Sequence, residues 1–116
     1  MMHHELKILP QWFDVVANGD KTVELRKNDR DYRVGDTLIL QEWDADVKTY
    51  TGRTVTRLVT HIVLDAEFEG LAPGYCALSL LDPVEWVELV QYRELAKRVE
   101  QNGVHIEPTA EYQNED

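Results

Sequence analysis

The chain has 116 residues, of which 43% are hydrophobic and 29% are charged, and its formal net charge at pH 7 is −10. This length predicts a single domain, and the apolar content is sufficient for one packed core, which argues against wholesale disorder. No apolar run approaches the roughly 20 residues of a membrane span, and the N-terminus lacks the pattern of a secretory signal, so we expect a cytoplasmic protein without membrane contacts.

The basic residues are concentrated in the middle of the chain. Residues 20–57 contain eight of the twelve Lys and Arg residues, whereas residues 58–116 contain twelve acids and three bases. An acidic chain argues against nucleic acid binding, but this distribution allows a locally basic site. The acidic second half favours solubility over docking of a basic partner, so no protein partner is expected. Cys76 lies in an apolar run and is predicted to be a buried thiol in a reducing compartment.

The first third of the chain predicts a strand, a helix and a second strand. Residues 5–9 alternate polar and apolar side chains, as a strand does. Pro10 suits the first turn of a helix that ends at Asn18-Gly19. The apolar face of this helix contains Trp12, Phe13, Val15 and Val16.

The second predicted strand, residues 21–27, has a polar and an apolar face. The polar face holds Thr22, Glu24 and Arg26, and the apolar face, which we expect to point into a core, holds Val23 and Leu25. Opposite charges on one strand face can pair, so a solvated salt-bridge ladder is one explanation of this pattern. A functional site is the other, because Lys21 emerges at a corner between helix and strand where a pocket often forms.

The rest of the chain predicts three strands and a second helix. Strands are expected at residues 36–43, 53–64 and 75–81, connected by a hairpin turn and a loop that contains Glu67 and Glu69. A helix begins at Asp82-Pro83 and ends near Asn102, and residues 104–116 form an acidic tail that we expect to be flexible.

This order of elements predicts an α+β fold, a small β-barrel with a helix after the first strand and an added C-terminal helix. The expected organisation is a barrel domain over residues 1–82, a helix over residues 83–103 that packs on it, and the tail over residues 104–116. Periodicity alone leaves another α+β sandwich as an alternative.

Residues 19–26 match G-x-K-x-x-E-x-R, the motif of ASCH domains, which belong to the PUA-like β-barrels. The turn Val34-Gly35-Asp36 before an apolar strand also fits that family. The stretches "HELKILPQWF", "KTVELRKNDRDYRVGD" and "FEGLAPGYCALSL" resemble a subfamily without assigned function that is common in bacteria and their phages. The resemblance covers about residues 3–82. It implies a barrel with a cleft near the motif that binds RNA or a nucleotide-like ligand, without a cofactor.

Carried over by position, Lys21, Glu24 and Arg26 become the residues of this cleft. Arg26 offers a planar fork for phosphate or a base edge, Lys21 offers a mobile charge, and Glu24 can orient either cation. The other ligand-binding candidates are Lys27, Arg30, Arg33 and Tyr75. Further candidates are Arg53 and Arg57 for phosphate contacts, and Trp43 and Tyr50 for base stacking.

A hydrolase is the alternative to a binding domain. Some ASCH proteins resemble amidohydrolases that deacylate modified cytidines, in which a lysine activates a threonine nucleophile. This chain keeps Lys21, but Glu24 occupies the nucleophile's position, and Thr22 lies about 6–7 Å earlier along the strand. Glu67 or Glu69 could supply the acid. A ribonuclease could instead use Glu24 as base with Lys21 or Arg26. No metal site is expected, because the histidines lack ligand-like spacing.

Overall fold

The structure, a computed structural model, describes residues 1–103, so the predicted tail at residues 104–116 lies outside the described residues. In chain order its elements are β1 (His3–Ile8), α1 (Pro10–Ala17), β2 (Val23–Lys27), β3 (Thr37–Asp44), β4 (Thr49–Leu64), a short 3-10 helix (Asp65–Glu67), β5 (Tyr75–Leu81) and α2 (Pro83–Gln101). All predicted strands and helices are present. The chain divides into two compact units, Met1–Pro83 and Val84–Asp116, which are described separately.

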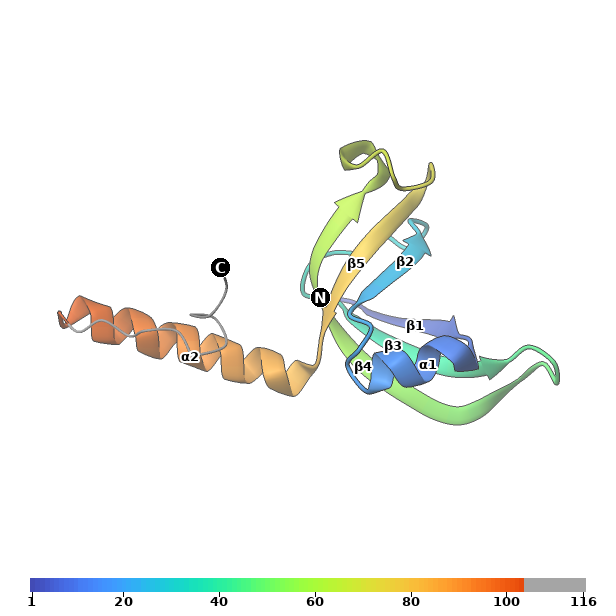
Figure 1. Cartoon of the computed structure of the whole chain (residues 1–116), viewed down its shortest axis with the longest axis horizontal. Helices are drawn as coiled ribbons and strands as arrows, with labels where there is room; N and C mark the ends of the chain where they lie inside the picture. Colours follow the sequence, from blue (N-terminus) through green and yellow to red (C-terminus); the bar gives the residue numbers. More distant parts are fainter. Residues whose placement is uncertain (104–116) are drawn as a thin grey trace. The chain divides into compact units, whose positions relative to one another are not determined.

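The five strands of the first unit form one sheet in the order β1-β3-β4-β5-β2. β1 pairs with β3 in parallel, and the other pairs are antiparallel. The 16-residue β4 pairs with both β3 and β5, and register shifts at Gln41/Trp43 and Val59/His61 mark irregularities of the kind that increase local twist. The sheet curls into a half-barrel (Figure 1). The α+β class is confirmed, and the barrel is an open, curled sheet with β1 and β2 as its edges.

The core of the first unit lies between the sheet and α1, which packs on β3 and β4. Phe13 and Val16 of α1 are buried, as their place on its apolar face predicts. Cys76 in β5 is fully buried, and burial raises the pKa of its thiol. The prediction of a buried thiol is therefore confirmed.

The turn Val34-Gly35-Asp36 ties the N-terminal strand to the sheet. Gly35 has a φ of 97°, a value that favours glycine, and its N–H donates to the carbonyl oxygen of Val59. The buried Asp36 carboxylate accepts hydrogen bonds from the Met2 N–H at 3.0 Å and lies 2.8 Å from His4 Nε2. Burial alone would raise the pKa of Asp36, but these hydrogen bonds outweigh it and lower the pKa. This turn therefore has a structural role.

The α2 helix is the described part of the second unit. It begins at Pro83, as predicted, and Gly103 follows its end with a φ of 79°. No residue of α2 is buried, and its hydrophobic side chains alternate with charged ones around the helix. Within residues 1–103, no helix is both long and apolar enough to cross a membrane.

Candidate functional site

The β2 strand turns its charged side chains inward and its apolar side chains outward. Glu24 is 4% exposed, whereas Leu25 is 59% exposed and Val23 is also exposed. The prediction that Val23 and Leu25 point into the core is therefore wrong. Among the described strands, β2 has a neighbour only on the side of β5, and its inward side chains pair with each other beside the open gap toward β1.

Lys21, Glu24 and Arg26 form an ion-pair triad around the buried Glu24 carboxylate. Lys21 Nζ lies 2.9 Å from Glu24 Oε1, and Arg26 Nε lies 2.8 Å from Glu24 Oε2. The Lys21 and Arg26 side chains are 30% and 22% exposed, so neither is a freely solvated cation. A carboxylate removed from water needs such partners. The structure thus brings the three motif residues together as a half-buried triad, not as a solvated ladder.

Arg26 also connects the two edges of the open sheet. Its Nη2 donates a hydrogen bond to the carbonyl oxygen of Lys7 in β1, at 2.9 Å. Lys21 Nζ donates to the carbonyl oxygen of Val23 in β2, at 2.6 Å. We call the gap between β1 and β2 the seam. Because no backbone ladder joins these strands, side chains of the motif satisfy carbonyl groups along it.

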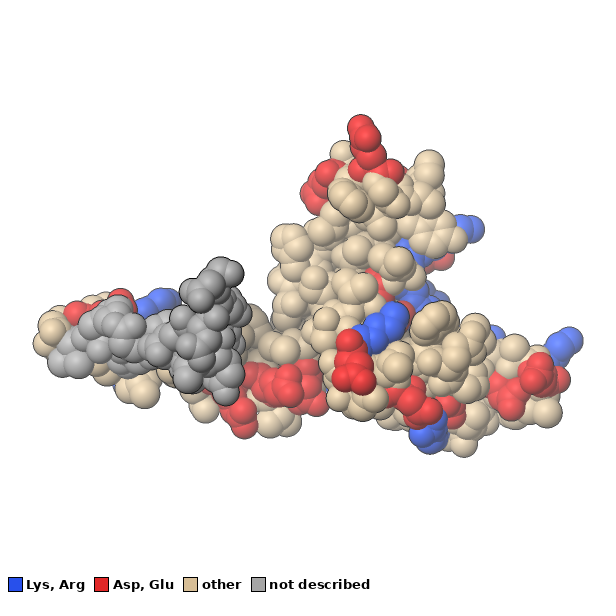
Figure 2. Space-filling model, viewed as in Figure 1, with Lys and Arg blue, Asp and Glu red and all other residues tan. Residues whose placement is uncertain are grey.

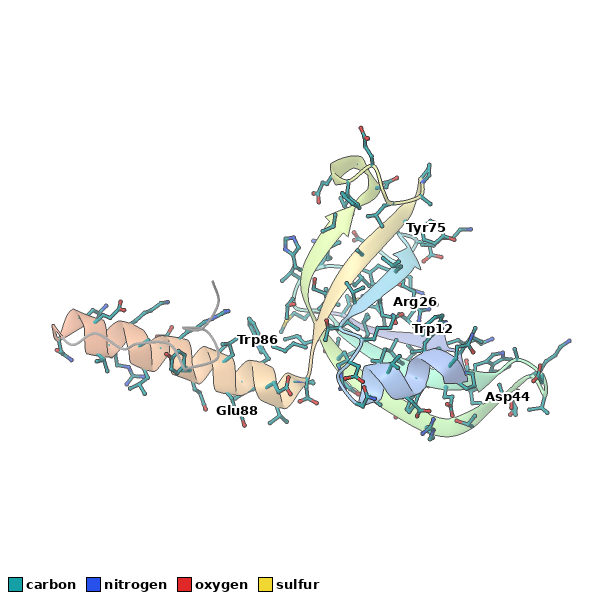
Figure 3. The ribbon with its side chains drawn as sticks, viewed as in Figure 1. Trp12, Arg26, Asp44, Tyr75, Trp86 and Glu88 are labelled. Carbon is teal, nitrogen blue, oxygen red and sulfur yellow. The ribbon has the colours of Figure 1, made fainter. Side chains whose placement is uncertain are left out.

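A pocket of about 430 Å³ lies at the seam and includes Arg26 in its lining, and we call it the apolar pocket. It is lined by the triad and by the apolar side chains of Leu9, Trp12, Val23 and Leu25. Trp12 shares the apolar face of α1 with Phe13 and Val16 but is 49% exposed. Figure 3 shows Trp12 and Arg26 near each other, between α1 and β2. An exposed indole beside cations is suited to stack on a planar ligand.

A second pocket of about 420 Å³ adjoins the first, and we call it the basic pocket. Both pockets are lined by Lys7 and Arg26, so they meet at the seam. The charged residues that line the basic pocket are Lys7, Arg26, Lys27 and Arg30 against Glu5 and Asp29. Its formal charge is thus two positive units in a chain of −10. In the view of Figure 2, some Lys and Arg atoms lie between β2 and α1, the side of the apolar pocket, next to Asp and Glu atoms.

Three cations of the basic pocket have no carboxylate partner. Within residues 1–103, Lys7, Lys27 and Arg30 make no ion pair at 4.0 Å or less. The Lys7 ammonium instead lies 3.8 Å from the ring centroid of Trp43. A cation–π contact of this kind leaves the positive charge uncompensated. The pocket therefore presents cations that an anion can still neutralise.

Several candidates from the sequence lie outside both pockets. Arg33 pairs with Asp31 at 3.1 Å on the surface. Arg57 is largely buried and donates through Nη2 to the Val16 and Ala17 carbonyl oxygens, at 3.0 and 3.2 Å, at the end of α1. The other residues in this group are Thr22, Trp43, Arg53, Glu67, Glu69 and Tyr75. Tyr75 lies at the start of β5 (Figure 3) and pairs in register with Lys27.

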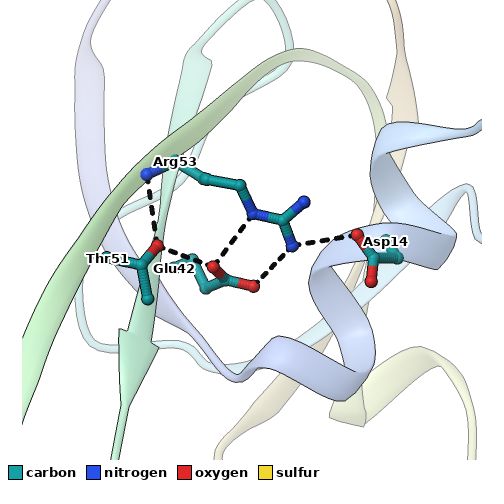
Figure 4. A network of polar contacts seen from close by, with 4 residues as sticks. All are labelled: Asp14, Glu42, Thr51 and Arg53. Carbon is teal, nitrogen blue, oxygen red and sulfur yellow. Dashed lines mark hydrogen bonds and ion pairs between the residues drawn. The ribbon is translucent and has the colours of Figure 1, made fainter.

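Arg53 belongs to a separate network that fastens α1 to the β3–β4 hairpin (Figure 4). It contacts Glu42 at 2.7 Å and Asp14 of α1 at 2.9 Å, and its guanidinium lies 4.3 Å from the Phe13 ring centroid. Hydrogen bonds from Arg53 and Thr51 lower the pKa of Glu42 to about 2. With both carboxylates engaged, Arg53 has a structural role.

Comparison with known proteins shows that the chain matches a protein family and is similar to a phage protein. Residues 3–80 match the family described as Domain of unknown function (DUF3850). The chain belongs to the DUF3850 family. It is 48% identical over 59 residues to "Uncharacterized 12.9 kDa protein in GpA 3'region" of Escherichia phage P2, an alignment that covers 51% of this chain and 52% of that protein. The chain thus spans about half the length of this relative, and the predicted kinship with phage proteins is confirmed to that extent.

The sequence alone does not identify three residues of this DUF3850 chain that line the pockets. It predicts that Lys7 is a polar position of an alternating strand, that Trp12 belongs to a buried helix face, and that Tyr32 is a turn residue. Their common position at the seam depends on the curl of the sheet. A partial signal is the position of Trp12 in the first turn of α1, two residues after Pro10, because side chains in a first helical turn often lie at the rim of a core. Among the described residues, no cluster of three or more His, Cys, Asp or Glu could hold a metal ion.

Proposed function

We propose that this DUF3850 chain binds RNA or a nucleotide-like ligand at the seam. The observation that carries the proposal is the convergence of Lys7, Arg26, Lys27 and Arg30 on one pocket of a chain whose net charge is −10. Three of these cations have no carboxylate partner among the described residues, and cations gathered in one pocket attract phosphate. Charged residues that serve only solubility need not converge on one pocket.

The apolar pocket supports the nucleoside half of this ligand. Trp12 presents an exposed indole next to Leu25 and Arg26, and all three line the pocket. Stacking of a base on an aromatic side chain contributes about 1–3 kcal/mol per base and tolerates different sequences. Each pocket also has the volume of about 300–1,000 Å³ that is usual for small-ligand sites. A base and a phosphate of one ligand could therefore occupy neighbouring pockets.

The resemblance to ASCH domains points to the same ligand class. The motif residues Lys21, Glu24 and Arg26 lie at the apolar pocket, and an open, curled five-stranded sheet is compatible with a small barrel of the PUA-like type. The proposal includes membership of that superfamily. A solved structure of a DUF3850 protein would test it by its strand order and by the closure of the seam.

Binding has more support than hydrolysis. The Lys21 ammonium is engaged by Glu24 and by the carbonyl oxygen of Val23, and Thr22 does not line either pocket. A lysine that activates a nucleophile must be free to accept its proton. Both Glu24 oxygens are likewise bonded to cations, which leaves this carboxylate poorly suited as a general base.

The proposal is tested by NMR titration of the labelled full chain. Single-stranded RNA of a few nucleotides, cytidine and N4-acetylcytidine are added in turn, while product formation is followed by chromatography. We expect shifts at the amides of Lys7, Trp12, Arg26 and Lys27 without turnover. Release of acetate or of cleaved RNA would favour the hydrolase instead. The absence of shifts with every ligand would contradict the proposal, and the triad would then be purely structural.

A further inference from the structure

The basic pocket is lined by a buried tyrosine whose hydroxyl has no hydrogen-bond partner among the described residues. Tyr32 is 7% exposed, yet its hydroxyl makes no hydrogen bond within the described residues. No buried side-chain N or O atom of those residues lacks a hydrogen-bond partner, so the Tyr32 hydroxyl must keep contact with solvent, which it can reach through the pocket that it lines. Burial raises its pKa, and the hydroxyl therefore remains protonated and able to donate.

The Arg26 guanidinium has spare donors at the same place. Its Nε binds Glu24 and its Nη2 binds the Lys7 carbonyl oxygen, whereas Nη1 makes no hydrogen bond to any residue from 1 to 103. Arg26 is thus held in position by two contacts and still presents donors. A guanidinium fixed in this way suits the oxygens of a phosphate, which it can contact with little further loss of rotamer freedom.

Lys27 and Arg30 complete the set from the other side of the pocket. Both side chains are exposed, and neither has a carboxylate partner in the part of the chain that the structure describes. With Lys7 and Arg26 they outnumber the two carboxylates of the pocket, Glu5 and Asp29. Glu24 compensates Arg26, but with Lys21 and Glu24 of the adjoining apolar pocket included, five cations still face three carboxylates. This excess of two positive charges is closer to the charge of a phosphate monoester, about −1.5 to −2 at pH 7, than to the single charge of a phosphodiester.

From this geometry we propose that the basic pocket binds the terminal phosphate of a nucleotide, a phosphate monoester, while the attached nucleoside lies against Trp12 in the apolar pocket. The inference rests on the proposed function and narrows its ligand class. Arg26 and Lys7, which line both pockets, contact the ligand where the phosphate joins the nucleoside. The monoester has two sources, a free nucleoside monophosphate or the phosphorylated end of an RNA strand.

The test compares ligands that differ only in the monoester. Affinities of the full chain are measured by calorimetry for cytidine, for its 5′- and 3′-monophosphates, and for inorganic phosphate. An RNA trinucleotide is measured with and without a terminal phosphate. We expect at least one monophosphate to bind roughly tenfold more tightly than cytidine, because its phosphate adds hydrogen bonds to charged donors, which are stronger than those between neutral groups. A preference for the phosphorylated trinucleotide over the mononucleotide would identify a strand end as the source.

The double variant Lys27→Ala/Arg30→Ala tests whether the phosphate binds in the basic pocket. It should remove most of the advantage of the monophosphate over cytidine, while Arg26 and Lys7, which line both pockets, remain to contact the ligand at the seam. Arg33→Ala is the matched control, since it removes a charge nearby in the sequence but outside both pockets. Folding is checked by the NMR spectrum of each variant, and Arg30→Ala alone serves if the double variant unfolds.

The outcomes separate this inference from the proposed function. If cytidine and its monophosphates bind equally, the phosphate site is wrong while nucleoside binding stands. The site is also wrong if the advantage of the monophosphate over cytidine is undiminished in the double variant. If inorganic phosphate binds as tightly as the monophosphates, the nucleoside half of the inference and the proposed function both fail. If none of the ligands binds, both are overturned together.

Discussion

Glu24 is a buried carboxylate on an edge strand, and each of its oxygens binds one cation. Cations that only line a pocket could be removed without harm to the fold. Lys21 and Arg26 differ from such cations, because both side chains are mostly buried and compensate the charge of Glu24. The motif therefore stabilises the seam as well as lining a pocket.

We predict that Arg26→Ala lowers the free energy of unfolding by about 1–3 kcal/mol, because it leaves the buried Glu24 carboxylate with one partner and removes the link to the Lys7 carbonyl. Urea denaturation followed by circular dichroism measures the loss. Adding Glu24→Gln to Arg26→Ala should recover part of it, since the neutral side chain needs no counter-charge. The surface pair of Arg33 and Asp31 supplies the control, and Arg33→Ala should change stability by less than about 0.5 kcal/mol. Equal stability of Arg26→Ala and the unmodified chain would disprove the structural role.

At the scale of elements, α1 depends on side chains from the sheet for its position. It has no side-chain hydrogen bond at its N-terminal cap and no basic residue in its last turn. Arg57 of β4 supplies the missing positive charge by donating to the Val16 and Ala17 carbonyl oxygens. A short helix is marginal in isolation, so such tertiary contacts determine whether it forms.

Arg57→Ala should therefore loosen the end of α1. We expect the overall stability to fall by roughly 1–2 kcal/mol, because two carbonyl groups lose a charged donor. Hydrogen exchange should accelerate at the Asn18 and Gly19 amides, which bond to α1 carbonyl oxygens. Arg57→Lys keeps the positive charge, so its stability and its amide exchange rates should lie between those of the unmodified chain and those of Arg57→Ala. Unchanged exchange at these amides in Arg57→Ala would show that the helix end does not depend on this contact.

At the scale of the whole molecule, the first unit contains a complete core. Among the described residues, the buried hydrophobic side chains all lie between Leu6 and Leu80, and no residue of α2 is buried. The family match also ends at residue 80, before α2 begins. The core therefore does not require α2 for its completion.

A fragment of residues 1–83 should accordingly fold alone. We expect a single cooperative thermal transition and a dispersed NMR spectrum, because every core side chain is retained. The difference in midpoint temperature from the full chain would measure the contribution of α2, which the sequence predicts to pack on the barrel. Loss of cooperative unfolding in the fragment would contradict the independence of the first unit.

The sequence by itself determined the order and type of the elements. Alternation of side chains marked the strands, while Pro10, Gly19 and Pro83 marked helix boundaries, and each of these signals is local in the chain. The motif Lys21, Glu24 and Arg26 could also be found from its spacing. Contacts between its members lie within five residues, so they needed no knowledge of the fold.

Only the tertiary structure decided which face of β2 is buried and what meets at the seam. Strand alternation shows that Glu24 and Leu25 lie on opposite faces, but the curl of the sheet decides which face looks inward. Lys7, Trp12 and Tyr32 come from three different segments, and they meet the motif because β1, α1 and β2 converge at the open edge of the sheet. The pockets arise from packing between distant segments, which no local pattern in the chain encodes.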